Sequence, residues 1–248
     1  MKIKPSTLLG CAFAFCLLAL RVSAADDRIG SGKNEITIHP INHATLSLSC
    51  NGVTLYADPV GEAKRFADLP APDLILVTDI HGDHMSAPTL EAIAKDKTHI
   101  IVPAAVAEKL TEALKSKLII LKNGETKEIN GLKITAVPMY NLSADRLKFH
   151  DKGRGNGYVV EMGGKRIYLS GDTEDIPEMR ALKNIDVAFI CMNLPYTMTE
   201  EQAASAVREF HPKIVYPYHY RGSDTEKFKK LVGTDAGVEV RLRDWYAK

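Results

Sequence analysis

The chain has few cysteines, and they form no recognisable pairing pattern. Cys50 and Cys191 are the two that lie beyond the first twenty of its 248 residues. One such pair, far apart in sequence, excludes a small fold stapled by disulfides. Neither has a Cys or His neighbour at the spacing of a zinc motif, so zinc ligation by cysteine is not expected. We therefore predict that Cys50 and Cys191 are buried free thiols.

An excess of charge of one sign is also absent. The formal net charge is +1, although 25% of the residues are charged. Without an excess of basic residues, the chain has no electrostatic signature of nucleic-acid binding. We therefore expect a small-molecule partner and no nucleic acid.

No apolar run is long enough to cross a bilayer as a helix. The longest covers residues 8–20, whereas a transmembrane helix needs about 20 apolar residues. Lys2 and Lys4 precede this run, and the small-residue stretch 22–24 follows it, which is the pattern of a cleaved signal peptide rather than a retained anchor. We predict that residues 1–24 are a signal peptide, that no stable membrane span is retained, and that the protein is exported, periplasmic or secreted.

Residues 25–248 contain no linker, low-complexity tract or sequence repeat, which predicts a single domain. Alternating hydrophobicity predicts two or three strands over residues 35–59, with a hairpin turn at Asn51-Gly52. Residues 71–78 predict a buried strand, and the amphipathic stretch 104–116 predicts one helix. Strand-rich sequence followed by strand–helix units occurs twice. This order predicts an α/β fold in which two sheets lie between helices.

Glycine-containing pairs and one helix cap predict further elements. Residues 117–140 predict three strands divided at Asn123-Gly124 and Asn130-Gly131. Gly163-Gly164 predicts another hairpin turn, and the capping box that begins at Thr199 predicts a helix.

Imidazole and carboxylate side chains gather at the ends of three predicted strands. The stretch LILVTDIHGDHM places four of them directly after a buried strand, and two more follow later strands. Loops at strand ends are where a sheet can hold side chains from distant segments around one point. Neutral nitrogen and anionic oxygen ligands together suit zinc, and also iron or manganese. The predicted metal ligands are Asp79, His81, Asp83, His84, Asp172 and His219.

Together these motifs resemble the metallo-β-lactamase superfamily, whose pattern is H-x-H-x-D-H followed by a further His, a bridging Asp and a final His. The stretches INHATLSLS, NGYVVEMGGKRIYLSGDTED and YPYHY resemble its branch of predicted metal-dependent hydrolases related to the ascorbate-6-phosphate lactonases. The resemblance covers nearly all of residues 25–248. It implies an α/β fold arranged as a four-layer αββα sandwich.

The resemblance also implies a site for one or two ions, Zn²⁺ above all, with Mn²⁺ or Fe as alternatives. His81 would belong to the first metal, and Asp83, His84 and His219 to the second, with Asp172 bridging them. A metal-bound hydroxide would attack a small ester, lactone, amide or phosphodiester. Asp83 would also act in catalysis by orienting this nucleophile or handling its proton.

Two positions depart from the family pattern. Asp79 stands where the first His is expected, and Asn141 where the third His is expected. Asp79 can still ligate through oxygen, whereas Asn141 is a poor ligand whose amide can bind a water molecule or the substrate. His150 either folds back as the missing imidazole or is a solvated or substrate-contacting residue. Both departures affect the ligands of the first metal. A single ion bound by Asp83, His84, Asp172 and His219 is therefore an alternative to two ions.

Other residues are candidates for the pocket. By resemblance, His43 faces the site and acts in catalysis, the alternative being packing at a strand end. Lys152 and Arg154, in the glycine-rich stretch DKGRGNG, either bind an anionic substrate group or are simply solvated. Asn193 and Tyr196 are candidates for the rim.

Three functions are compatible with this sequence. The first is an exported metal-dependent hydrolase that acts on a small ester, lactone, amide or phosphodiester, with an anionic substrate favoured if the basic residues of the pocket face the metals. The second is a metal-binding protein of the same fold with a degraded first site and little or no turnover. Redox chemistry at iron is the third, and it is disfavoured because no stretch resembling a flavin-binding domain follows.

Overall fold

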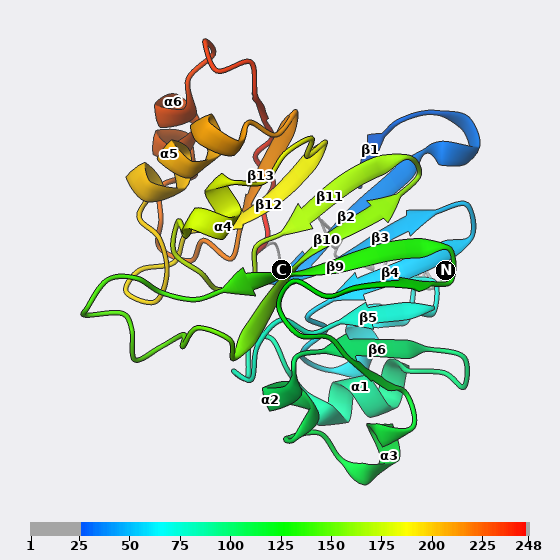
Figure 1. Cartoon of the computed structure of the whole chain (residues 1–248). Coiled ribbons are helices and arrows are strands. Elements are labelled where there is room, and N and C mark those ends of the chain that lie inside the picture. Colours follow the sequence, from blue (N-terminus) through cyan, green and yellow to red (C-terminus); the bar gives the residue numbers. More distant parts are fainter. Residues whose placement is uncertain (1–25, 247–248) are drawn as a thin grey trace, which may run out of the picture.

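Two seven-stranded sheets form the centre of the molecule, and helices cover the outer face of each (Figure 1). The computed structural model describes residues 26–246. The predicted signal peptide, residues 1–24, lies outside the described residues. Within them, the order of layers is helices, sheet, sheet, helices. The predicted α/β fold, a four-layer αββα sandwich, is therefore confirmed.

The first sheet is built in sequence order from the N-terminal half. Its strands are β1 (Asp27–Ile29), β2 (Ile36–Asn42), β3 (Thr45–Cys50), β4 (Val53–Ala57), β5 (Leu74–Leu76), β6 (His99–Val102) and β7 (Leu118–Ile120). Strands β1 to β4 pair antiparallel, whereas β4 to β7 pair parallel. The parallel strands therefore end at one common edge, where the motif after β5 begins.

The second sheet repeats this plan with the C-terminal half. Its strands are β8 (Thr126–Ile129), β9 (Leu132–Met139), β10 (Gly155–Met162), β11 (Lys165–Leu169), β12 (Val187–Cys191), β13 (Ile214–Tyr218) and β14 (Glu239–Val240). Strands β8 to β11 pair antiparallel, and β11 to β14 pair parallel.

The helices are short and fall into two groups. Beside the first sheet lie η2 (Ala63–Phe66), α1 (Ala87–Ile93), α2 (Ala104–Ala107) and α3 (Glu112–Lys115), and beside the second lie α4 (Pro177–Arg180), α5 (Glu200–Phe210) and α6 (Thr225–Val232). A further short helix, η1 (Gly32–Asn34), lies in the connection between β1 and β2. Among residues 26–246, no helix has the length and apolarity that a bilayer span requires. The predicted capping box is present, because Thr199 and Gln202 exchange their side-chain and backbone hydrogen bonds at the start of α5.

Burial follows the alternation expected of half-buried strands. Ile38 of β2 pairs with Leu48 of β3, and both are fully buried. They belong to one core with Ile134 and Val160 of the second sheet. A separate apolar cluster joins the other face of the first sheet to α1, α2 and α3. Burial of apolar area from both faces of the sheet is thus what holds the four layers together. Cys50 and Cys191 are buried and unpaired in the described residues, as predicted.

Two of the predicted elements differ from the structure. The stretch 104–116 forms two short helices instead of one, because the backbone at Thr111 is extended (φ −70°, ψ 159°). The break lets Val106, Leu110 and Leu114 all pack against the first sheet. Asn123-Gly124 is no hairpin turn within one sheet, since it links β7 of the first sheet to β8 of the second. The turns at Asn51-Gly52 and Asn130-Gly131 have the positive φ angles that two-residue hairpins require.

Candidate metal centre

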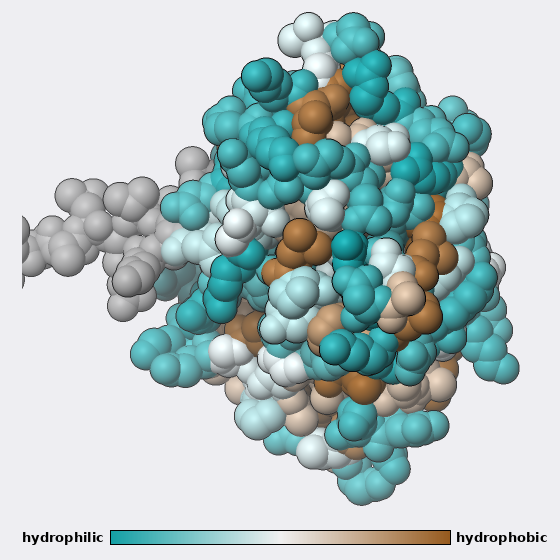
Figure 2. Space-filling view, turned by 90° about the vertical axis from the view of Figure 1, so that its left-hand side faces the viewer, coloured by the Kyte–Doolittle hydropathy of each residue, from teal (hydrophilic) through white to brown (hydrophobic). Residues whose placement is uncertain are grey.

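The functional side chains meet at the edge of the sandwich where the parallel strands end. Five segments contribute. Two belong to the first half of the chain, the turn between β2 and β3 and the loop after β5, and three belong to the second, the long loop between β9 and β10, the loop after β11 and the end of β13. The loop between β9 and β10 extends to the left in Figure 1. Figure 2 views the molecule from that side, and this face is mainly hydrophilic with small separate apolar areas.

Four of the predicted ligands form a compact group, which we call the second half-site: Asp83, His84, Asp172 and His219. The Nε2 atom of His84 lies 3.3 Å from Oδ2 of Asp172, and Nε2 of His219 lies 3.4 Å from Oδ1 of Asp172. The same His219 nitrogen is 3.3 Å from Oδ2 of Asp83. Ligand atoms of His84, Asp172 and His219 all lie within 4.8 Å of one another. Small side-chain adjustments would bring these atoms around one cation.

A buried carboxylate orients His84. Oδ2 of Asp58 lies 2.8 Å from Nδ1 of His84 and accepts a 2.6 Å hydrogen bond from Thr78. Since the carboxylate only accepts, it places the proton of the neutral ring on Nδ1 of His84, so that Nε2 is the nitrogen that can ligate a metal ion. Asp58 was not among the predicted residues. A signal was present in the sequence, because Asp58 directly follows β4. This strand pairs with β5, which leads into the metal motif.

The unpartnered atoms of the second half-site fit a cation. Among the described residues, Nε2 of His84 and Oδ1 of Asp172 are buried without a hydrogen-bond partner. Buried polar atoms are costly when unsatisfied, by about 1–3 kcal/mol each. Burial disfavours the charge on Asp172, but the neighbouring His219 and His84 hold the pKa of this carboxyl well below its usual range. An anionic carboxylate beside a bare imidazole nitrogen is a donor set for a divalent ion.

The two remaining predicted ligands, Asp79 and His81, form another group together with His150. We call this group the first half-site, because Asp79 and His81 correspond to the first metal of the family pattern. Nδ1 of His81 lies 2.7 Å from Oδ2 of Asp79, and ligand atoms of all three residues lie within 4.8 Å of one another. The structure brings His150 into the site, where it is 2% exposed and its Nε2 is 3.3 Å from Oδ2 of Asp172. His150 is therefore not a solvated residue, which was one of the alternatives predicted for it.

A guanidinium group binds Asp79. Arg154 donates from Nε to Oδ1 at 3.1 Å and from Nη2 to Oδ2 at 3.0 Å, and Nη2 also donates to the carbonyl of Phe149. Burial opposes the charge of Asp79, but its hydrogen bond with His81 and the nearby positive groups hold the pKa of Asp79 below its usual range. Arg154 is thus engaged inside the protein. Lys152 points elsewhere, toward Glu178 at 3.0 Å.

Asn141 lies behind His150 instead of facing the ligand cluster. Its amide nitrogen is 2.9 Å from the carbonyl of Arg146, 2.7 Å from the carbonyl of Tyr196 and 3.1 Å from Nδ1 of His150. It is 1% exposed. Asn141 therefore supports the loop and the His150 ring, and it does not face the pocket.

His43 contacts the second half-site from the turn between β2 and β3. Its Nε2 is 3.2 Å from Oδ2 of Asp83, its Nδ1 is 2.6 Å from the hydroxyl of Tyr246, and its ring centre is 3.7 Å from that of His219. Burial lowers the pKa of His43 below its usual value, although Asp83 acts in the opposite direction. His43 thus lies in the site and not merely at a strand end, and Tyr246 is a contact that the sequence did not suggest.

Two glycines in the stretch GRGNG permit close backbone approaches at the site, one between the two sheets and one within the second sheet. A Cβ atom on Gly155 would lie 2.9 Å from the carbonyl of Thr78, and one on Gly157 would lie 2.7 Å from the carbonyl of Ser170. Asn156, between them, donates its backbone N–H to Thr78 at 2.9 Å. Gly155 therefore brings the start of β10 against the metal motif, and Gly157 brings β10 against the end of β11.

A pocket of about 620 Å³ opens onto both half-sites. Its lining residues are His43, His81, Asp83, Phe149, His150, Asp172, Asn193, Leu194, Pro195, Tyr196, His219 and Arg221. Asn193 and Tyr196 therefore line the pocket, as predicted for its rim. Arg221 is exposed and forms no ion pair among residues 26–246, although its guanidinium lies 5.5 Å from the ring centre of Tyr246.

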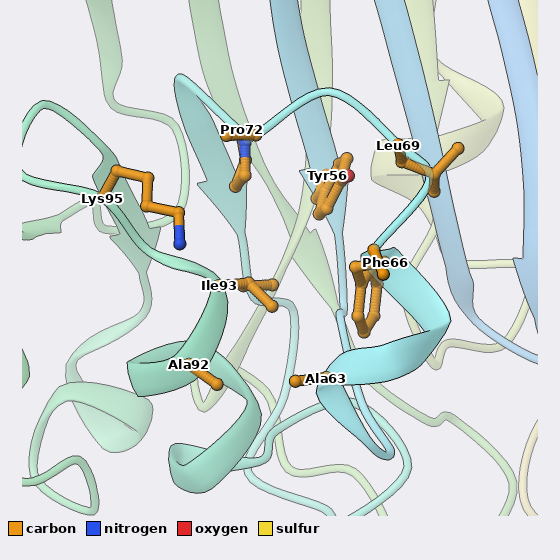
Figure 3. A pocket seen from close by; sticks show the side chains of 10 residues that line it. Tyr56, Ala63, Phe66, Leu69, Pro72, Ala92, Ile93 and Lys95 are labelled. Carbon is orange, nitrogen blue, oxygen red and sulfur yellow. The ribbon is translucent and has the colours of Figure 1, made fainter.

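A second cavity has a different character. It has a volume of about 210 Å³ and lies between η2 and α1, lined mainly by apolar side chains such as Phe66 and Ile93 (Figure 3). Lys95 is its charged residue, and no His, Asp or Glu lines it. This cavity has no ligands for a metal ion.

Comparison with known proteins agrees with this geometry. Residues 37–219 match the family described as Beta-lactamase superfamily domain. A UPF0173 metal-dependent hydrolase from Thermococcus onnurineus is 35% identical over 195 residues, which cover 75% of this chain and 85% of that protein. A UPF0173 metal-dependent hydrolase from Pyrococcus abyssi is 34% identical over 191 residues, covering 73% and 82%.

Solved structures give the same result. A protein from Parabacteroides distasonis, whose name proposes a metal-dependent hydrolase, has 40% identity and a TM-score of 0.82, covering 89% of this chain and 99% of that chain. Igni18, a metallo hydrolase from Ignicoccus hospitalis, has 23% identity and a TM-score of 0.70, covering 84% and 94%, and supports the fold alone. The chain therefore belongs to the beta-lactamase superfamily, and within it to the UPF0173 metal-dependent hydrolases.

Proposed function

We propose that the protein hydrolyses a small, anionic ester, lactone, amide or phosphodiester with the help of a divalent ion in the second half-site. The observation that carries this proposal is the convergence of Asp83, His84, Asp172 and His219 on one point, with Nε2 of His84 left bare. When bound, a divalent ion lowers the pKa of a water molecule and polarises the bond to be broken. Lactones are included because the sequence motifs resemble the lactonase branch.

The protein's own residues have separable tasks in this reaction. Asp83, whose side chain is 45% exposed, is the carboxylate open to the pocket, so it can orient the attacking water and accept its proton. His43 holds Asp83 through Nε2 and is itself held by Tyr246 through Nδ1. Asp58 holds Nδ1 of His84, so that Nε2 of this ring faces Asp172.

An anionic substrate is supported by Arg221. Its guanidinium lies at the pocket without a carboxylate partner in the described residues, whereas Phe149, Leu194 and Tyr196 supply an apolar wall. A guanidinium binds carboxylate or phosphate oxygens with paired hydrogen bonds. The pocket thus suits a substrate that has an anionic group and an apolar part.

Zinc is the proposed ion, because imidazole nitrogen and carboxylate oxygen together are typical zinc ligands. The proposed place of action is outside the cytoplasm, in the periplasm or beyond the cell, on the ground of the signal-peptide pattern in residues 1–24. N-terminal sequencing of the protein recovered from cell fractions tests this part, since cleavage after Ala24 is expected.

The test of the function combines metal analysis with a panel of probes. Purified protein should contain zinc and hydrolyse at least one of a 4-nitrophenyl ester, a simple lactone, an anilide and bis(4-nitrophenyl) phosphate. His84→Ala and His219→Ala should lose metal and activity together. His99→Ala is the matched control, because His99 begins β6 at the opposite edge of the sheet. Activity without any bound metal, unchanged by a chelator, would contradict the proposal.

A metal-binding protein with little turnover is the second candidate, and the two departures at Asp79 and Asn141 favour it. The same experiment separates the two. Stoichiometric zinc without hydrolysis of any probe would support the second candidate.

A further inference from the structure

We propose that the first half-site binds no metal ion, and that the guanidinium of Arg154, paired with Asp79, provides the positive charge there. The protein would then work with one divalent ion, held in the second half-site. This inference rests on the proposed metal-dependent function, and it concerns the two positions at which the chain departs from its family.

Arg154 engages both oxygens of Asp79. The two hydrogen bonds, of 3.1 and 3.0 Å, form the planar fork by which arginine binds a carboxylate. Asp79 is fully buried, and the Arg154 side chain is 18% exposed. A metal ion bound to either oxygen of Asp79 would have to displace a hydrogen bond from the Arg154 guanidinium. The ion would also be repelled by the permanent positive charge of this neighbouring guanidinium. Asp79 is therefore already neutralised.

The charges of the two half-sites differ accordingly. In the first, the negative charge of Asp79 is balanced by Arg154. In the second, Asp83 and Asp172 have no Lys or Arg partner among residues 26–246, and their neighbours are imidazoles. Two uncompensated carboxylates match one divalent ion, so the second half-site is the place where such an ion is stabilised.

The tautomer of His150 leads to the same conclusion. The carbonyls of Arg146 and Tyr196 only accept hydrogen bonds, so they fix the NH₂ end of the Asn141 amide, which also faces Nδ1 of His150 at 3.1 Å. If Nδ1 of His150 carried a proton, two N–H donors, this nitrogen and the amide nitrogen of Asn141, would point at each other without an acceptor. In the neutral ring the proton is therefore on Nε2, which lies 3.3 Å from Oδ2 of Asp172. A protonated Nε2 has no lone pair for a metal.

Metal counting tests the inference on the full mature protein. After saturation with Zn²⁺ and dialysis, mass spectrometry of the metal should give one ion per chain, and titration of the metal-free protein with Co²⁺ should reach its visible absorption plateau at one equivalent. Two ions per chain, with hydrolysis intact, would overturn this inference and leave the proposed function standing. No bound ion and no hydrolysis would overturn both.

Variants of the first half-site provide a second test of the inference. The uncharged pair Asp79→Asn with Arg154→Gln removes both charges together and should still bind one ion per chain. Asp79→His with Arg154→Ala restores the family pattern at position 79 and should raise the count toward two. Arg166→Gln is the control, since Arg166 pairs with Glu161 away from the site. A drop to fewer ions in the uncharged pair, with the fold unchanged by circular dichroism, would show that the first half-site had ligated metal.

Nitrogen-15 NMR of the histidine rings reads the tautomer directly. In the zinc-loaded protein the His150 signal, assigned by its loss in His150→Gln, should show a protonated Nε2 and a bare Nδ1. A protonated Nδ1 with Nε2 shifted by zinc would place a metal on His150 and overturn the inference.

Discussion

At the scale of single residues, the site depends on side chains that touch no substrate. Asp58 lies behind His84, and Asn141 lies behind His150. Each sets which ring nitrogen carries the proton, but with opposite consequences. In the neutral rings, Asp58 leaves the lone pair on Nε2 of His84, whereas Asn141 favours the proton on Nε2 of His150. The same residue type can thus serve as a ligand or as a hydrogen-bond donor according to its neighbour.

Replacement of Asp58 should weaken metal binding without removing a ligand. Asp58→Asn keeps the shape but no longer offers His84 a carboxylate, so zinc affinity should fall by about 10–100-fold. Competition with a coloured chelator measures the dissociation constant. The control is Asp73→Asn, because Asp73 accepts a hydrogen bond from Thr54 at the opposite edge of the sheet. An unchanged affinity in Asp58→Asn would mean that Asp58 does not position His84.

Arg221 should decide the preference for charged substrates. For a 4-nitrophenyl ester that carries a free carboxylate, Arg221→Gln should raise KM about tenfold, because a charge-assisted hydrogen bond contributes about 1.5 kcal/mol. The methyl ester of the same probe should be hydrolysed equally well by both proteins. Arg65→Gln, on η2, is the control for a lost surface charge. An equal loss on both probes would assign Arg221 a structural role instead.

At the scale of elements, one carboxylate joins the edge strand β1 of the first sheet to β13 and to the segment after β14 of the second. Asp27 of β1 accepts a 2.6 Å hydrogen bond from Tyr216 of β13, and it pairs with Arg241 at 3.1 Å and Arg243 at 2.5 Å. A three-residue strand such as β1 has little pairing of its own. This cluster is therefore expected to hold the start of the first sheet against the end of the second.

The contribution of Asp27 to stability should depend on pH. Burial disfavours its charge, but Tyr216, Arg241 and Arg243 hold the pKa of Asp27 below the usual value of 3.8. A lowered pKa stabilises the fold above the unfolded-state pKa, and this stabilisation disappears as the pH falls through the folded-state pKa. Asp27→Asn should therefore lower the free energy of unfolding by about 1 kcal/mol at pH 7, with a difference from the parent that shrinks below about pH 4.

Urea unfolding at a series of pH values measures this difference. Asp68→Asn, at an exposed position, serves as the matched control and should follow the parent at every pH. A difference that stays constant down to pH 2.5 would show that the ion pairs of Asp27 are not its cause.

At the scale of the whole molecule, the metal centre links the two halves of the sandwich. His84 belongs to the first half of the chain, and Asp172 and His219 to the second, so a cation between them joins both sheets. A cation that binds the folded state and not the unfolded state stabilises the folded state, by about 2.7 kcal/mol at a free ion concentration of 100 Kd. For a domain of this size, that corresponds to a rise in Tm of roughly 5–10 °C.

Removal of the metal should therefore lower Tm. Scanning calorimetry of the chelator-treated protein should show the fall, and added Zn²⁺ should restore the original Tm. His84→Ala should melt at the same temperature with and without Zn²⁺. If the parent protein also melted at one temperature in both conditions, the cation could not join the two sheets.

The sequence by itself determined the elements and the metal motif. Strand alternation, Asn-Gly turns and the capping box at Thr199 are local signals, read from residues a few positions apart, and most of the strands appear where they were expected. The stretch 104–116 was predicted less well, because packing of Leu110 and Leu114 against the sheet overrode its helical periodicity. The ligands Asp83, His84, Asp172 and His219 came from a pattern of strand ends, which topology gathers at one edge.

Only the tertiary structure decided how the departures from the family pattern are accommodated. Arg154 reaches Asp79 across 75 positions of sequence, and Asn141 reaches the carbonyl of Tyr196 across 55. Which partner a loop side chain meets depends on the path of the loop between β9 and β10, which contacts Glu174 and Thr197 of the second half and, through Arg154, Asp79 of the first. No periodicity of the sequence predicts that path. Side-chain hydrogen bonds act within about 3 Å, so the roles of Asp79 and His150 follow from contacts that form after the two sheets have packed.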